Sequence, residues 1–239
     1  MILSAPIHQL KRKARLLSRA ERIPLHVALD RVAAEEGYRS WNLLAAKQPG
    51  MASVRALWPL LEPGDLVLVA GRPGQGKTLA SLALLAEAMR AGRQAIFLTL
   101  EYTPADVLSR LRAINVEPAE FAGLFDCDCS DAISANYVMV RLADASRGTV
   151  AVIDYLQLLD QRRDTPELEL QVRTLKAFAR ERGVILVFLS QVDRSYEASG
   201  KSFPGIADVR LPNPLDLALF DKTCFVNRGE ARFRAAAPG

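Results

Sequence analysis

The sequence predicts an α/β fold, in which a parallel sheet carries helices on both faces and is preceded by a small helical module. Three observations support this prediction. From Asp65 onward, apolar strand-like stretches alternate with helix-like stretches, which is the rhythm of a parallel sheet covered on both sides. A glycine-rich run directly follows the first strand, and polar residues end three later ones. With 239 residues, the chain is long enough to bury such a core.

The α/β body can be divided into elements in order along the chain. Short, mostly apolar runs predict strands at residues 66–70, 94–100, 124–127, 149–153, 184–190 and 222–227. The helices between them are expected at residues 79–91, 103–114, 131–145 and 165–183. Thr103 and Asp131 should cap the second and third of these helices, and Gly183 should end the fourth.

The first fifty residues form a basic helical module. Apolar residues at helical spacing predict helices over residues 4–20 and 25–37, and Ser40 should cap a third short helix that includes Trp41. The segment carries nine Lys and Arg residues against four acidic ones, whereas the rest of the chain is close to neutral. This charge favours contact with a polyanion such as nucleic acid, although a solvated helix face explains it equally well. Prolines and glycines then mark a linker, so we expect domains at 1–50 and 64–239, joined by 51–63.

The glycine-rich run has the pattern of a phosphate-binding loop, G-x-x-x-x-G-K-[ST], between a strand and a helix. In such a loop, successive backbone N–H groups surround the phosphates of a nucleoside triphosphate. Lys77 would reach the β and γ oxygens, and the hydroxyl of Thr78 would bind Mg²⁺. The predicted nucleotide-binding residues are Gly71, Arg72, Pro73, Gly74, Gln75, Gly76, Lys77, Thr78 and Leu79.

Three polar side chains follow predicted strands, and in open parallel sheets ligands bind beyond those strand ends. Asp154 ends an apolar strand and is expected to hold Mg²⁺ beside Thr78; the alternative is a structural cap. Glu101 is the candidate general base for an attacking water, unless it only caps the next helix. Gln191 can hydrogen-bond the γ-phosphate, or else the start of the following loop.

Other features narrow the class of protein. No apolar run is long enough to cross a bilayer, and the basic start lacks the apolar core of a signal peptide, so we expect no membrane partner and a cytoplasmic location. The three cysteines, Cys127, Cys129 and Cys224, lack a zinc spacing and should be reduced.

Four segments together resemble the ordered motifs of the DnaB-type replicative helicase C-terminal ATPase domain: residues 71–78, 97–101, 152–159 and 189–195. The resemblance covers residues 60 to about 228 and is most specific in D-Y-L-Q-L and L-S-Q-x-[ND]-R. It implies a RecA-like fold, Mg²⁺-dependent ATP hydrolysis, binding of single-stranded DNA, and homo-oligomers such as a hexameric ring. By this resemblance Glu101 is the catalytic glutamate, Lys77 binds phosphate and Gln191 senses the γ-phosphate.

The sequence also departs from that family. Helicases of this type continue past the strand at 222–227 into a further hairpin, which we expect to be missing before Gly239. Only Arg228, Arg232 and Arg234 then remain as candidate arginine fingers. The loop at 196–214, where a DNA-facing loop would lie, has two basic residues and Phe203 as its stacking candidate.

Two functions from different classes follow. The first is a Mg²⁺-dependent, DnaB-like helicase or DNA-dependent ATPase. The alternative is a regulatory module in which ATP switches oligomerisation or partner docking without unwinding. A small-molecule kinase is a third reading, but it leaves the D-Y-L-Q-L string unexplained.

Overall fold

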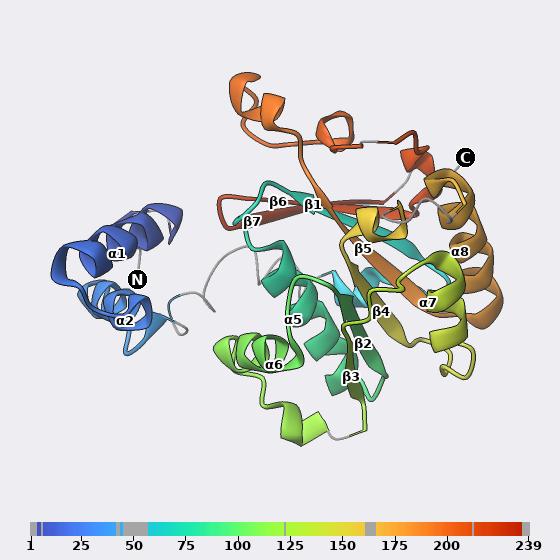
Figure 1. The fold of residues 1–239 in the computed structure, drawn as a ribbon, viewed down its shortest axis with the longest axis horizontal. Helices are drawn as coiled ribbons and strands as arrows, with labels where there is room; N and C mark the ends of the chain where they lie inside the picture. The colour runs from blue at the N-terminus through green and yellow to red at the C-terminus, as the bar shows by residue number, and fades with distance from the viewer. Residues whose placement is uncertain are drawn as a thin grey trace.

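The computed structural model describes residues 4–5, 7–41, 44, 57–121, 123–160, 166–211 and 213–235. Within them, seven strands form one sheet in the order β3-β2-β4-β5-β1-β6-β7 (Figure 1). Neighbouring strands from β3 to β6 pair in parallel, and only β7 runs antiparallel, against β6. The strands are β1 (Leu66–Gly71), β2 (Ala95–Thr99), β3 (Phe125–Asp128), β4 (Val150–Asp154), β5 (Ile185–Gln191), β6 (Lys222–Asn227) and β7 (Glu230–Ala235).

Helices cover both faces of the sheet, which confirms the predicted fold class (Figure 1). On one face, α5 (Lys77–Arg90) and α6 (Pro104–Ala113) pack against alternate strand residues such as Val67, Phe97 and Val152. On the other face, α7 (Ala135–Arg141) and α8 (Leu168–Arg182) pack against the residues in between, such as Leu68 and Phe188. Burial on both faces explains why the central strands read as continuous apolar runs.

One predicted helix is wrong in its bounds. Residues 131–145 were expected to form a helix capped by Asp131, but α7 covers only Ala135–Arg141 and its cap is Ser134, whose hydroxyl accepts the Tyr137 N–H at 3.3 Å. The physical reason lies just before it. The side chains of Asp128 and Ser130 accept backbone N–H groups two residues on, at 3.0 and 3.1 Å, and hold the chain in turns that compete with a helix.

The end of the chain corrects a second prediction. We expected no hairpin after the strand at 222–227, but β6 and β7 form one. Its turn is Arg228-Gly229, with φ values of 50° and 82°, the positive pair that suits a two-residue hairpin. Phe233 and Ala231 point to the α5 face of the sheet, which pins the register.

The basic module has a small core of its own. Helices α1 (Ile7–Glu21) and α2 (Leu25–Glu35) bury apolar residues against each other, among them Leu10, Ala14 and Val32. These two helices confirm the prediction for residues 4–37. The third helix, expected after Ser40, falls largely outside the described residues, as do residues 51–56 of the predicted linker. Among the described helices, none combines the length and apolar composition that a membrane crossing requires.

Candidate nucleotide-binding site

The glycine-rich loop joins the end of β1 to the start of α5. Gly74 and Gly76 have φ values of 77° and 93°, a conformation that favours glycine, and a Cβ at either position would meet nothing within 4 Å. Their backbone therefore lines open space at the N-terminus of a 14-residue helix, where an anion is stabilised. Gly71 has a different role, because a Cβ there would lie 2.5 Å from the carbonyl oxygen of Val226 on β6.

The order of the strands gathers the predicted site residues. Asp154 pairs in register with Thr99 at the end of β2, and Gln191 pairs with Gly71 at the end of β1. Glu101 follows β2 by two residues, and its N–H is held by the hydroxyl of Thr99 at 3.0 Å. One cavity of about 430 Å³ is lined by Lys77, Thr78, Glu101, Asp154 and Gln191 together. The structure thus brings together the five side chains predicted to act on the phosphates, the metal ion or the attacking water.

Asp154 is the most perturbed acid of this cavity. Its side chain is only 3% exposed, and its Oδ2 lies 3.3 Å from the hydroxyl of Thr78. Burial, followed by the charge of Glu101, raises the pKa of Asp154 to about 7, against the opposing effects of Lys77 and Thr78. A buried carboxylate beside a hydroxyl is a pair of oxygen ligands that a hard cation such as Mg²⁺ can bind.

Lys77 lies close enough to this carboxylate for its charge to lower the pKa of Asp154. Burial lowers the pKa of Lys77, while Asp154 and Glu101 act in the opposite direction. Its Nζ is 3.4 Å from the carbonyl oxygen of Arg72, so the ammonium group lies within the glycine-rich loop. Open glycine backbone, a buried lysine and a hydroxyl–carboxylate pair are the groups that a nucleoside triphosphate with Mg²⁺ needs.

Two residues of the loop turn their side chains elsewhere. The guanidinium group of Arg72 donates to Glu197 at 2.8 Å and to the carbonyl of Val192 at 3.1 Å. The side-chain oxygen of Gln75 accepts the N–H of Arg228, in the hairpin turn, at 2.7 Å. These contacts tie the phosphate-binding loop to the segment after β5 and to the hairpin, and neither Arg72 nor Gln75 is among the described residues that line the cavity.

The candidate arginines of the hairpin lie outside the cavity. Arg228 lies in the turn beside Gln75, and Arg232 stacks on the ring of Phe203 with its guanidinium carbon 4.1 Å from the ring centre. Neither they nor Arg234 are among the described residues that line the cavity. Phe203, the predicted stacking residue for single strands, therefore has one ring face covered by an arginine.

Sequence reasoning missed several residues that line this cavity, among them Lys11 and Trp41 of the basic module, and Tyr102 and Arg110 near α6. Arg110 stacks on Tyr102, with the guanidinium carbon 4.1 Å from the ring centre. Tyr102 precedes α6 and Arg110 lies within it, so the sequence gives only a weak local indication that the two side chains meet. For Lys11 and Trp41 no local signal exists, since their neighbours in the cavity are distant in the sequence.

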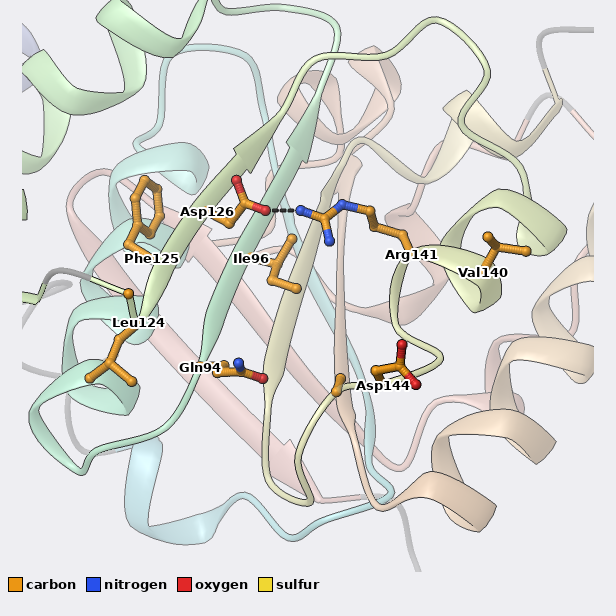
Figure 2. Close-up of a pocket in the computed structure, with 10 residues that line it drawn as sticks. Gln94, Ile96, Leu124, Phe125, Asp126, Val140, Arg141 and Asp144 are labelled. Atoms are coloured by element: carbon orange, nitrogen blue, oxygen red, sulfur yellow. Dashed lines mark ion pairs between the residues drawn. The ribbon is translucent and has the colours of Figure 1, made fainter.

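A second cavity, of about 470 Å³, lies beside the edge strand β3 and is lined by Ile96, Asp126, Val140, Arg141 and Asp144, among others (Figure 2). Asp126 and Arg141 form an ion pair within it. It contains none of the predicted site residues. Nearby, Cys127 and Cys129 place their sulfur atoms 3.8 Å apart, and burial raises the pKa of Cys127 to about 12. No cluster of three metal-binding side chains occurs in the part of the chain that the structure describes.

Comparison with known proteins supports the predicted relationship. Residues 126–230 match the model of the DnaB-like helicase C terminal domain. The replicative DNA helicase DnaB of Helicobacter pylori is 28% identical over 192 residues, covering 66% of this chain and 40% of that protein. A probable plasmid replicative DNA helicase of Chlamydia trachomatis is 26% identical over 204 residues, covering 72% of this chain and 45% of that protein. The chain thus spans less than half the length of these relatives.

Solved structures show the same fold. One solved ATPase domain superposes with a TM-score of 0.56 at 22% identity, covering 69% of this chain and 70% of that domain. A DnaB-like replicative helicase, described with its interactions with primase, gives 0.57 at 23% identity, covering 69% of this chain and 47% of that protein. The domain match and the relatives confirm the resemblance predicted from the motifs: this chain is similar to the DnaB-like helicase C terminal domain over residues 126–230, and it shares the fold of the solved ATPase domains.

Proposed function

We propose that this protein is a Mg²⁺-dependent ATPase of the DnaB-like helicase type, whose activity responds to single-stranded DNA. The observation that supports this most strongly is the convergence of Lys77, Thr78, Glu101, Asp154 and Gln191 on one cavity. A phosphate-binding loop alone would fit many nucleotide-binding proteins. A buried acid and two further polar groups at adjacent strand ends favour hydrolysis.

Each residue then has one task. The N–H groups around Gly74 and Gly76 bind the phosphates, and the Lys77 ammonium group donates to the β and γ oxygens. Thr78 and Asp154 would hold Mg²⁺, which neutralises charge on those oxygens when bound. Glu101 orients the attacking water and accepts its proton, since its carboxylate lines the cavity beyond β2. The amide of Gln191 hydrogen-bonds the γ-phosphate and so reports its loss to the segment that follows.

The same proposal covers the location, the assembly and the domain organisation expected from the sequence. The protein acts in the cytoplasm as a homo-oligomer, a hexameric ring being the assembly that the resemblance implies. Residues 1–50, 51–63 and 64–239 act as module, linker and ATPase domain. In its strongest form, the proposal is that ATP hydrolysis by this protein drives the unwinding of DNA.

The test is phosphate release from ATP by the full chain with Mg²⁺, with and without single-stranded DNA. Wild type should hydrolyse ATP faster when DNA is present, and Lys77→Ala should be inactive, because it removes the ammonium group from the phosphates. No hydrolysis by wild type in either condition would sink the motor function.

A regulatory switch is the second candidate. It is favoured by the contacts of Arg72 and Gln75, which join the nucleotide loop to the segment after β5 and to the hairpin. Sizing in solution with and without ATP and Mg²⁺ separates the two functions. A switch without turnover predicts a change of assembly and no phosphate release; an unchanged assembly counts against it.

A further inference from the structure

The basic module contributes to the wall of the nucleotide cavity. Lys11 on α1 and Trp41 line it together with Lys77, Thr78 and Asp154 of the α/β body. Figure 1 shows α1 and α2 beyond the end of the sheet, on the side of α6. The module therefore meets the α/β body at the nucleotide cavity, although the two have separate cores.

Lys11 differs from other basic residues of the module. Lys13 pairs with Glu35 and Arg31 pairs with Glu21, so their charges are compensated within the module. Among the described residues, Lys11 forms no ion pair or hydrogen bond, and it is less exposed than Lys13. Burial, then the charges of Arg15 and Arg110, lowers the pKa of Lys11. A half-buried ammonium group surrounded by other cations lacks the anion that would stabilise it.

The surroundings specify which anion would fit. The cavity also contains the phosphate-binding loop, so a polyphosphate there would face cations from both sides. Lys11, Lys77 and Arg110 are the cations among the described lining residues, and the guanidinium group of Arg110 is stacked on Tyr102. The hairpin arginines are not among the described residues that line the cavity. Lys11 and Arg110 are thus the cations outside the loop that line the cavity, and Lys11 is the one that the basic module contributes.

We propose that Lys11 binds the phosphates of ATP from the side opposite the phosphate-binding loop, in the same chain, so that the basic module completes the nucleotide site. This inference rests on the proposed function. In it, Lys11 supplies the positive charge that an arginine finger supplies in other nucleoside triphosphatases. Trp41 forms the adjacent wall and reports on occupation of the cavity.

The test is binding of ATP and ADP to the full chain with Mg²⁺, measured by titration calorimetry. Lys11→Ala should weaken ATP binding about tenfold, the size of one charge-assisted contact, and Lys11→Arg should restore most of it. Lys13→Ala is the matched control, since it removes a lysine of the same helix whose charge is already paired. The loss should be greater for ATP than for ADP. Equal affinities of Lys11→Ala and Lys13→Ala would overturn the inference.

Two further measurements keep this result separate from the proposed function. Lys77→Ala should lose ATP binding; if wild type binds no ATP, or Lys77→Ala binds as well as wild type, the proposed function fails. If Lys77→Ala loses binding and Lys11→Ala does not, only the role of Lys11 fails. The chain has two tryptophans, so Trp58→Phe leaves Trp41 as the single emitter. Saturating ATP should change its emission, and an unchanged spectrum would contradict a module that closes the site.

Discussion

Replacing Asp154 by Asn should stabilise the metal-free protein and abolish its response to Mg²⁺. Asp154 is 3% exposed, and its pKa is raised from 3.8 to about 7, mainly by burial. A pKa raised in the folded state means that the folded protein holds the proton more tightly than the unfolded chain. The resulting stability is present below the unfolded pKa and is lost as the pH rises through about 7.

The size of the effect follows from the two pKa values. The change from 3.8 to about 7 corresponds to a cost of about 4 kcal/mol for the ionised carboxylate at pH 8. Asn removes this cost but also removes a favourable charge beside Lys77, so the net gain at pH 8 should be about 1–3 kcal/mol. At pH 5 the folded wild type is protonated, and the advantage of Asn should be smaller by about 3 kcal/mol.

The assay is urea unfolding at pH 8 and pH 5 in the presence of EDTA. Asp144→Asn is the control, because Asp144 is an exposed carboxylate that lines the other cavity. It should show no such dependence on pH. Addition of ATP and Mg²⁺ should stabilise wild type and leave Asp154→Asn unchanged. A variant that is less stable than wild type at pH 8, or an equal difference at both pH values, would refute the burial argument.

Two further predictions concern the loop that precedes α5. Arg72→Ala and Glu197→Ala each break an ion pair in which the Glu197 side chain is 61% exposed and the Arg72 side chain 19% exposed, so urea unfolding should shift by about 1 kcal/mol at most. ATP binding should persist while stimulation by DNA is lost, and retained stimulation would argue against this coupling. Gly71→Ala should cost about 2–4 kcal/mol in the same unfolding assay, because its Cβ would lie 2.5 Å from the oxygen of Val226. Gly74→Ala, in open space at φ 77°, should cost only about 1 kcal/mol, and equal losses at both glycines would contradict the close approach of β1 and β6.

The sequence carried enough information for the sheet and for most of the site. The central strands are buried on both faces, so each stands out as an apolar run, and the residue after each run lies at the ligand-binding edge. Capping chemistry was equally local: Thr103 caps α6 and forms the predicted first turn with Asp106, in a reciprocal pair of hydrogen bonds.

Competing local hydrogen bonds and long-range packing account for the errors. Asp131 had the chemistry of a cap, but side chains at Asp128 and Ser130 fold the chain into turns before Ser134 takes that role. The hairpin had a signal in Arg228-Gly229 and in the alternation of Arg232 and Phe233. We overlooked this signal because the segment lacks the motif that the corresponding hairpin carries in helicases of this type.

The approach of Lys11 to Lys77 could not be predicted, because 66 positions separate them in the sequence and no pattern links a helix face to a distant loop. Likewise, the pattern around Gly71 predicted contact with phosphate for the whole loop. Whether a side chain such as Arg72 faces the phosphates or a neighbouring segment depends on tertiary contacts alone.

The most direct test of the hydrolytic site is single-turnover ATP cleavage by Glu101→Gln, with ATP affinity measured on the same protein. Glu120→Gln is the matched control, since Glu120 is an exposed glutamate that does not line the cavity. We predict that Glu101→Gln binds ATP and Mg²⁺ as wild type does and cleaves it at least about 100-fold more slowly, while Glu120→Gln is unaffected. Cleavage by Glu101→Gln at the wild-type rate would contradict the assignment of this cavity as a hydrolytic site.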